Sequence, residues 1–353
     1  MLIRTLLRHP GMRRLVTVTA LAVICVLAAA LLPLAVLFGG IGALRPGGRG
    51  RLARFSAFLA VYLAAEVTGL VKAVALWVRF FGRAARQRDR TRRERYEDAH
   101  YVLLDELLTR LWGTARRYFG LHIRPPDRQA PLPAGPLLVF SRHAGPGDSF
   151  LLVYALLEAV RRRPRIVLKH TLALDPLIDV VLSRTPNCFV GATEQERAQV
   201  PERIAELAAS LRPGDALLLF PEGGNFTRAR RSRLLERMRS RGRWSLLPTA
   251  RSLEHVLPAR STGVFAAIDA APPGATAVFV AHTGLDRLES VRDVWQAIPL
   301  DEPLELAWWT TPIEQVPTDA DDRETWLAAH WTRIDEWIDR RSTEPALNPP
   351  ASL

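Results

Sequence analysis

The sequence predicts an α/β fold in which a mixed β-sheet is flanked by helices and preceded by an N-terminal hydrophobic helical hairpin. Two long apolar segments within residues 1–100 predict the hairpin. After residue 100, short apolar runs alternate with amphipathic stretches, as strands and helices do in α/β proteins. We therefore expect an N-terminal membrane anchor with a basic juxtamembrane stretch (residues 1–100), one folded domain (101–342) and a flexible tail (343–353).

The composition favours a basic protein that meets a membrane. The chain has 353 residues, with 48 Lys and Arg against 36 Asp and Glu, and 48% of its residues are hydrophobic. Cys25 and Cys188 lie far apart in the sequence. The sequence therefore predicts neither a disulfide framework nor a CxxC metal site, and a reducing compartment fits.

The first apolar segment, residues 15–44, carries no charge. As a helix it is about 45 Å long at 1.5 Å per residue, which is enough to cross a bilayer. A signal peptide with Arg13 and Arg14 as its basic start is the alternative, but the apolar run is about twice as long as the usual hydrophobic region of such peptides. Pro33 is expected to kink the helix.

The second apolar segment, about residues 55–81, is interrupted by Glu66 and Lys72. Each charge costs about 2.5–3.5 kcal/mol at the centre of a bilayer. Because their spacing corresponds to a rotation of about 240° on a helix, the two charges do not form an ion pair on one face. A membrane-spanning helix and an interfacial or re-entrant helix both remain open for this segment.

Arginines flank both apolar segments. Arg4, Arg8, Arg13 and Arg14 precede the first segment, and the dense run RFFGRAARQRDRTRRER begins at Arg79, whereas the loop between the two segments holds Arg45, Arg49, Arg51 and Arg54. This distribution favours a hairpin with both ends in the cytoplasm. Anionic membrane lipids are the expected partners of the dense run. No nucleic acid is expected, because the run lacks interleaved aromatic residues; a solvated helix without a ligand is the remaining alternative.

Strands and helices are expected to alternate within the folded domain. The candidate strands are residues 136–140, 165–169, 216–220, 276–282 and 305–309. The candidate helices are residues 149–163, 196–211 and 321–341.

The segment RHAGPGD places a histidine and an aspartate on either side of a pliable turn. His143 follows a candidate strand, and Asp148 stands where the next helix begins. The turn lets the carboxylate fold back on the imidazole, where it would fix the tautomer and stabilise the imidazolium. The pair is then a general base with its orienting group. An ordinary loop with an exposed histidine is the alternative.

Two other kinds of catalytic site are disfavoured near this segment. No GxSxG elbow surrounds Ser141 or Ser149, so the proton would come from the hydroxyl of a substrate. A metal site is disfavoured because further ligands are not visible nearby in the sequence.

The segment LLLFPEGGNFTRARRSR, residues 217–233, has the features of an anion site. A strand leads into Glu222 and two glycines, Gly223 and Gly224, which allow a ligand close to the backbone. The arginines that follow, among them Arg228 and Arg231, offer bidentate hydrogen bonds to a phosphate. A Gly-rich turn before a solvated basic helix is the alternative.

Together these two motifs resemble those of glycerolipid acyltransferases of the 1-acylglycerol-3-phosphate acyltransferase type, whose signatures are H-x4-D and P-E-G. The segment EHVLPARSTGVF, with FPEGGNFT, is similar to the lysocardiolipin acyltransferase-like branch. The resemblance covers about residues 130–290. It implies that residues 101–342 form an acyltransferase domain.

The resemblance implies roles for individual residues. His143 would be the base and Asp148 its partner, and the acceptor hydroxyl would attack an acyl thioester without an acyl-enzyme. The substrate-binding positions would be Lys169, Glu222, Gly223, Gly224, Asn225, Arg228, Arg231 and Pro258. Asn225 departs from the family, which often has arginine there, and Arg228 or Arg231 would take over the phosphate.

The predicted function is a membrane-bound O-acyltransferase of phospholipid biosynthesis. It would move a fatty acyl group from acyl-CoA or acyl carrier protein to a lysophospholipid, with 1-acylglycerol 3-phosphate as the first candidate; another lysophospholipid or glycerol 3-phosphate is the alternative. A catalytically idle lipid-binding scaffold and a lipid hydrolase are rival functions. No metal or tightly bound cofactor is indicated. The expected location is the bacterial inner membrane, with the active site on the cytoplasmic face.

Overall fold

The structure is a computed structural model of the chain. It describes residues 9–43, 50–81, 90–124, 131–145, 147–191, 193–240, 247–286, 288, 291–300 and 302–343. Some predictions fall on other residues. Arg4, Arg8, Arg45, Arg49, residues 82–89 of the dense arginine run and the tail from residue 344 lie outside the described residues.

The chain divides into two compact units, each built from several segments. Unit 1 consists of residues 1–122, 150–200 and 295–301, and unit 2 consists of residues 123–149, 201–294 and 302–353. The predicted boundary at residue 100 lies inside helix α4 (Arg90–Phe119). The division into anchor, acyltransferase domain and tail stays a prediction.

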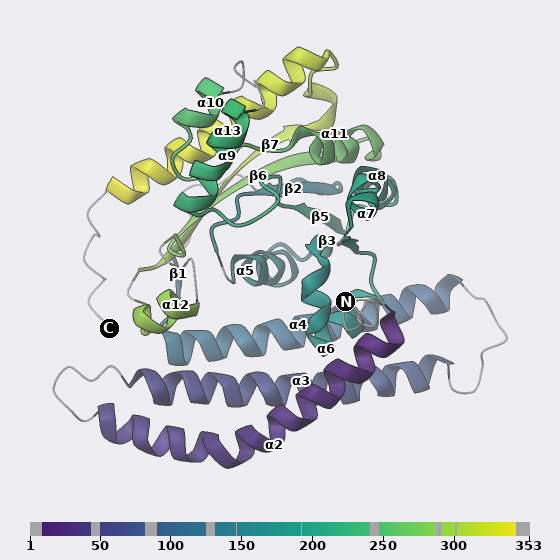
Figure 1. Cartoon of the computed structure of the whole chain (residues 1–353). Helices are drawn as coiled ribbons and strands as arrows, with labels where there is room; N and C mark the ends of the chain where they lie inside the picture. The colour runs from purple at the N-terminus through teal and green to yellow at the C-terminus, as the bar shows by residue number, and fades with distance from the viewer. Residues whose placement is uncertain are drawn as a thin grey trace. The chain divides into compact units, whose positions relative to one another are not determined.

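Unit 1 begins with three long helices, α2 (Pro10–Ala43), α3 (Arg51–Phe81) and α4. Figure 1 shows α2 as a bent helix. It contains Pro33, whose ring removes a backbone hydrogen bond inside a helix. α2 and α3 coincide with the two predicted apolar segments, and both are long and apolar enough to cross a membrane by length and composition.

Helix α3 packs against α4 from one end to the other. Near the start of α3, Phe58 stacks on Phe119 with 4.5 Å between ring centroids. Near its end, Phe81 meets Tyr96 edge to face at 4.9 Å. The two helices therefore lie side by side and run in opposite directions.

The two charges of α3 both have protein partners. Lys72 forms an ion pair with Glu106 of α4. Glu66 is buried, and its Oε2 accepts the backbone N–H of Leu177 at 3.2 Å. The expectation that Glu66 and Lys72 do not pair with each other is confirmed.

Unit 1 also contains two strands and short helices. β3 (Arg163–Lys169) and β4 (Cys188–Val190) pair in parallel. Between them lie the 3-10 turn η2 (His170–Leu174) and α6 (Pro176–Leu182), and α7 (Glu194–Ala198) follows β4. The Asp175 carboxylate caps α6 by accepting the Ile178 N–H at 2.9 Å. Arg13 and Arg14, at the start of α2, both bond to Asp179 of α6.

Five strands form the sheet of unit 2, in the order β1-β7-β6-β2-β5. They are β1 (Ile123–Arg124), β2 (Leu137–Ser141), β5 (Asp215–Leu219), β6 (Thr276–Thr283) and β7 (Leu304–Pro312). β2 is parallel to both β5 and β6, whereas β6 and β7 are antiparallel. The predicted mixed sheet is therefore confirmed. Every residue of β2 and β5 is buried, which explains their continuous apolar runs.

Helices flank this sheet. They are α8 (Val200–Ala209), α9 (Arg228–Ser240), α10 (Leu247–Ser252), α11 (Ser261–Ala270) and α13 (Ala320–Thr343). α11 packs on β2 and α13 on β6. α13 buries a stripe formed by Leu327, Trp331, Ile334 and Ile338, whose spacing places them on one helical face. α5 (Asp148–Tyr154) and α12 (Val291–Ala297) begin in unit 2 and end in unit 1.

The predicted elements are present, with two differences in the helices. All five candidate strands and the last candidate helix correspond to β2, β3, β5, β6, β7 and α13. The candidate helix at 149–163 is shorter, because α5 passes into a π-helical turn η1 (Ala155–Ala159) and β3 begins at Arg163. The candidate helix at 196–211 is divided into α7 and α8 before Pro201, a residue that favours the first turn of a helix. β1 and β4 are too short for a sequence period to reveal them.

Candidate active site

The candidate site lies at the edge of the sheet where β2, β5 and β6 end. These three strands are parallel neighbours, so their carboxyl ends meet at the same edge, where α/β proteins commonly bind ligands. His143 follows β2, Glu222 follows β5, and His282 lies near the end of β6. The strand order therefore brings together residues that are far apart in the sequence.

His143 and Asp148 form a hydrogen-bonded pair. The Nδ1 atom of His143 lies 2.8 Å from Oδ2 of Asp148. The same oxygen accepts the backbone N–H groups of Ala144 at 2.7 Å and Gly145 at 3.3 Å. The Asp148 side chain is completely buried, whereas 18% of the His143 side chain is exposed. The Nδ1 side of the imidazole is therefore bonded to a buried carboxylate, while another part of the side chain is accessible to solvent.

The glycines of the turn are needed for two different reasons. A Cβ atom on Gly145 would lie 2.7 Å from the carbonyl oxygen of Leu288, so the backbone passes too close for a side chain. Gly147 has a φ of +98°, which residues with a Cβ rarely adopt, although the space around it is open. The turn can therefore bring the carboxylate of Asp148 back onto His143.

The surroundings keep Asp148 ionised. Burial by itself raises the pKa of this carboxyl, but the hydrogen bond and charge of His143 and the N–H of Gly145 lower it, and the pKa lies below its usual value. An ionised carboxylate on Nδ1 keeps the hydrogen of the neutral ring on that nitrogen. The Nε2 atom of His143 is then the proton acceptor.

Glu222 connects the two sequence motifs. Its Oε1 accepts the backbone N–H of His143 at 2.7 Å, and its Oε2 accepts that of Leu257 at 2.9 Å. The carbonyl oxygen of His143 in turn accepts the N–H of Phe226 at 2.6 Å. The ring of His143 lies 4.7 Å from that of Phe220. His143 is therefore held through its backbone and its side chain by the segment that follows β5.

Glu222 is buried, and burial raises the pKa of its carboxyl to about 8. The N–H groups of Leu257 and His143 and the charge of Arg142 act in the opposite direction. Both carboxyl oxygens of Glu222 are occupied by backbone groups. Its contacts in the structure are therefore those of a residue that supports the loop, and its role in substrate binding stays a prediction.

Two arginines lie against the glycines that follow Glu222. A Cβ atom on Gly223 would lie 2.8 Å from Cζ of Arg260, and one on Gly224 would lie 2.6 Å from Nη1 of Arg230. Gly223 also has a φ of +68°, a left-handed conformation that favours glycine. Arg230 belongs to the arginine cluster that the sequence indicated after the glycines, whereas Arg260 was not predicted. Arg260 follows VLPA in the segment EHVLPARSTGVF, and the resemblance of that segment was the one available signal.

The other predicted members of the anion site have different surroundings. Asn225 Oδ1 accepts a hydrogen bond from Arg230 at 2.9 Å. Arg228 is exposed at the start of α9. Arg231 donates through Nε to Leu253 O and through Nη2 to Arg251 O, each at 2.7 Å. These bonds join α9 to the segment after α10, so the guanidinium of Arg231 is already used within the protein.

Helix α13 fixes the segment that carries Pro258. Asp335 of α13 accepts the N–H of Val256 at 3.1 Å, and Trp331 donates its indole N–H to Leu257 O at 2.7 Å. Because Leu257 also donates to Glu222, Pro258 comes next to the loop after β5. Lys169, by contrast, is an exposed residue at the end of β3 in unit 1, and its predicted role stays a prediction.

A second cluster of polar groups, which the sequence did not indicate, is buried behind His143. Arg142 and His282 are both completely or almost completely buried. Arg142 Nη1 donates to the carbonyl oxygen of His282 at 2.8 Å and also bonds to Asp286. His282 Nε2 lies 3.3 Å from Arg142 O and 3.8 Å from Asp148 Oδ2.

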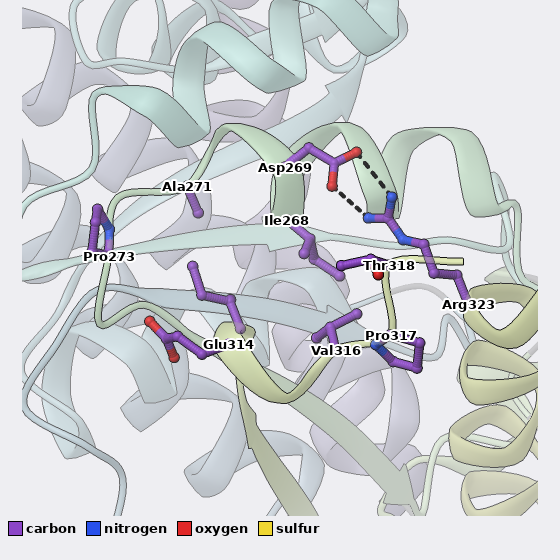
Figure 2. A pocket seen from close by; sticks show the side chains of 10 residues that line it. Ile268, Asp269, Ala271, Pro273, Glu314, Val316, Pro317, Thr318 and Arg323 are labelled. Atoms are coloured by element: carbon purple, nitrogen blue, oxygen red, sulfur yellow. Dashed lines mark hydrogen bonds and ion pairs between the residues drawn. The ribbon is translucent and has the colours of Figure 1, made fainter. Parts of the chain in front are cut away.

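A pocket elsewhere in unit 2 contains none of the predicted site residues (Figure 2). It lies between the end of α11 and the segment that joins β7 to α13. Figure 2 shows that Arg323 points at Asp269 across it, with Nη1 3.2 Å from Oδ2. The two charges already satisfy each other. Among the described residues, no group of His, Cys, Asp and Glu could hold a metal ion.

Comparisons with known proteins point to one family. Residues 125–271 match the family model described as Acyltransferase. No curated protein gives a significant match. The chain is similar in structure to the 1-acyl-sn-glycerophosphate (LPA) acyltransferase PlsC from Thermotoga maritima, with a TM-score of 0.50 and 13% identity, over 83% of this chain and 100% of that chain. At this identity the likeness concerns the fold, and the family match supports an acyltransferase.

Proposed function

We propose that this protein is a membrane-bound acyltransferase of phospholipid biosynthesis. It moves a fatty acyl group from an acyl thioester to the hydroxyl of a lysophospholipid, most readily 1-acylglycerol 3-phosphate. The observation that carries this proposal is the hydrogen-bonded pair of His143 and Asp148. The backbone N–H of His143 also bonds to Glu222 in the second motif. This arrangement supplies a positioned general base, and the family match supports acyl transfer.

The chemistry follows from the proton positions. His143 Nε2 takes the proton of the acceptor hydroxyl while the hydroxyl oxygen attacks the carbonyl carbon of the thioester. The carbon–sulfur bond then breaks, and the imidazolium returns its proton to the leaving sulfur, which departs as a thiol. Asp148 stabilises the imidazolium between these steps. The products are an ester and a free thiol, and the base is regenerated.

The acceptor is expected to carry a phosphate. The guanidinium of Arg260 lies against Gly223, and such a group gives a phosphate bidentate hydrogen bonds. We propose Arg260 as its ligand, in place of Arg231, whose donors bond to backbone carbonyls. The Thermotoga maritima protein is a 1-acyl-sn-glycerophosphate acyltransferase, which supports 1-acylglycerol 3-phosphate as the acceptor; another lysophospholipid or glycerol 3-phosphate is the alternative.

Replacing Arg260 tests this assignment. Arg260→Gln should raise the KM for 1-acylglycerol 3-phosphate about tenfold and change kcat little, because binding of the phosphate is weakened equally in the ground and transition states. Arg239→Gln, which removes an exposed arginine in the last turn of α9, is the control. Equal KM values for the two variants would contradict the role of Arg260.

The apolar helices support attachment to a membrane. Along α2, large apolar side chains such as Val26 and Phe38 are more than 60% exposed, and an exposed apolar surface of this length is stable only against lipid or protein. α3 lies beside α4 over its full length, and α4 is rich in charged residues. If α3 crossed the bilayer, α4 would be drawn into it. We propose that α3 lies along the membrane surface while α2 is embedded in the lipid.

A single introduced cysteine distinguishes these arrangements. In a chain whose Cys25 and Cys188 are replaced by alanine, Leu52→Cys places a thiol at the start of α3. If α2 enters and leaves the membrane on the cytoplasmic face and α3 lies on that face, a membrane-impermeant maleimide should label this thiol from the cytoplasmic side. Labelling only from the outer side would show that the hairpin crosses the membrane. The bacterial inner membrane and its cytoplasmic face are part of this proposal.

Thiol release tests the reaction itself. Membranes containing the protein receive acyl-CoA or acyl carrier protein carrying an acyl chain, with 1-acylglycerol 3-phosphate, glycerol 3-phosphate or another lysophospholipid offered in turn. We expect release that requires one acceptor and that falls about 10²–10⁴-fold in His143→Ala, the usual worth of a general base. His122→Ala, at an exposed histidine, is the control. Release of free fatty acid without an acceptor would indicate a hydrolase, and no release with any acceptor would favour the scaffold.

A further inference from the structure

His282 is a buried histidine that the proposed reaction does not use. It lies near the end of β6, its side chain has no exposure to solvent, and Nε2 lies 3.3 Å from the carbonyl oxygen of Arg142 and 3.8 Å from Oδ2 of Asp148. Burying a histidine costs folding free energy unless its ring forms hydrogen bonds. We therefore ask what the hydrogen bond of His282 does.

The neighbours of His282 determine its tautomer. Both groups that face Nε2, the Arg142 carbonyl and the Asp148 carboxylate, are hydrogen-bond acceptors. Nε2 must therefore carry the hydrogen. The other ring nitrogen, Nδ1, has no hydrogen-bond partner among the described residues. A proton on Nδ1 would lack an acceptor, which favours a neutral ring.

The carbonyl that His282 holds belongs to the peptide bond before the general base. This bond joins Arg142 to His143, and its two polar groups are held from opposite sides. Its oxygen faces Nε2 of His282 and accepts the hydroxyl of Ser141 at 3.0 Å. Its N–H donates to Glu222 Oε1 at 2.7 Å. The orientation of this peptide determines the position of the Cα atom of His143, and hence the positions that its imidazole can occupy.

The backbone of His282 is itself anchored. Its carbonyl oxygen accepts a hydrogen bond from Arg142 Nη1 at 2.8 Å, and the same guanidinium pairs with Asp286. Arg142 and His282 thus exchange hydrogen bonds, each through one side-chain nitrogen and one carbonyl oxygen. Such a reciprocal pair fixes the end of β2 against the end of β6.

We propose that His282 is a positioning residue for acyl transfer, which holds the Arg142–His143 peptide so that the His143 ring meets both Asp148 and the acceptor hydroxyl. This inference rests on the proposed function. His282 acts through the backbone and does not exchange a proton with the substrate. Its neutral ring is a constant donor, because burial and the nearby charge of Arg142 lower its pKa to about 4, against the opposing effects of Asp148 and Asp286.

Two substitutions at His282 distinguish the effect of losing its hydrogen bond from the effect of changing the side-chain volume. His282→Leu fills the space without a donor, whereas His282→Gln retains an N–H at nearly the reach of Nε2. We expect His282→Leu to lower kcat for thiol release at least tenfold with the KM values of acyl-CoA and 1-acylglycerol 3-phosphate unchanged, because displacing a base by about 1 Å costs this much or more. His282→Gln should recover most of the lost kcat.

A matched core substitution controls for lost stability. Phe279 lies on the same strand, is also completely buried, and faces Trp326 and His330 of α13. Phe279→Leu should lower Tm without lowering kcat of the folded enzyme. If His282→Leu does not accumulate, His282→Asn replaces it, since the shorter amide does not reach Arg142 O. His282→Asn should then show the same low kcat, while His282→Gln recovers most of it.

The outcomes separate this inference from the proposed function. No acceptor-dependent thiol release by the wild-type protein would overturn the function and, with it, this role of His282. Wild-type activity that persists in His282→Leu, or that is lost equally in the leucine and glutamine variants, would overturn the positioning role and leave the function standing.

Discussion

The backbone N–H of His143 donates to Oε1 of Glu222 at 2.7 Å, although 79 positions separate the two residues. This bond links the loop after β2 to the loop after β5. The other oxygen of Glu222 accepts the N–H of Leu257, in the segment before α11. One buried carboxyl group therefore aligns three segments around His143, and substitutions here should disturb all three together.

Glu222→Gln should destabilise the protein. A carboxyl group can accept at both oxygens, but an amide presents an NH2 group to one of the two backbone N–H donors. A buried donor left without an acceptor costs about 1–3 kcal/mol, and kcat should fall as the loop of His143 shifts. Thermal unfolding and thiol release measure the two effects. Glu314→Gln, which changes an exposed carboxylate that accepts the N–H of Gly274, should leave both unchanged, and an equal loss there would contradict this account.

Asp148→Asn should keep the turn and lose activity. The asparagine oxygen can still accept the N–H of Ala144, but the charge that stabilises the His143 imidazolium is gone. We expect kcat to fall about 10²–10⁴-fold while the KM of the acceptor stays within about threefold. Asp322→Asn, at an exposed position of α13, is the isosteric control. A variant with wild-type kcat would rule out Asp148 as the orienting group.

The protonation of His282 should be visible in the pH dependence of the protein's stability. Its pKa is lowered from 6.5 to about 4 in the folded protein, mainly by burial, so between these values the unfolded chain binds a proton that the folded chain does not. Its contribution to stability is complete above pH 6.5 and is lost as the pH falls toward 4.

The difference between two Tm profiles isolates this effect. Glu222, whose raised pKa of about 8 makes stability fall with rising pH, contributes equally to wild type and His282→Gln. The wild type should therefore lose more Tm than His282→Gln between pH 6.5 and 4.5. Parallel profiles would mean that His282 is not buried as a neutral ring.

The two glycines of the turn should respond differently to substitution. In Gly145→Ala the new Cβ meets the carbonyl oxygen of Leu288, so the turn must move and both Tm and kcat should fall. In Gly147→Ala only the left-handed backbone is strained, at about 1–2 kcal/mol, and Gly147→Asn should recover part of the loss. Gly113→Ala, in the C-terminal part of α4, where a Cβ would meet no neighbouring atom, is the control and should not destabilise. Equal effects at all three glycines would contradict the two separate causes.

The sequence by itself was sufficient for five of the strands, for the two apolar helices and for the pairing of His143 with Asp148. The continuous apolar runs of β2 and β5 identify buried strands because both faces of each strand are covered. The pair of His143 and Asp148 could be predicted because only a tight turn separates them, and a turn's geometry depends on its own residues. The mixed sheet and the two apolar helices were predicted for the same local reasons.

What only the tertiary structure decided is which distant residues support that pair. His282 is 140 positions from Arg142, and it meets the site because β6 is the parallel neighbour of β2. Arg260 lies beside Gly223, whereas the guanidinium of Arg231 bonds to Leu253, after α10. Such contacts depend on strand order and on the packing of whole elements, which no local pattern of residues encodes.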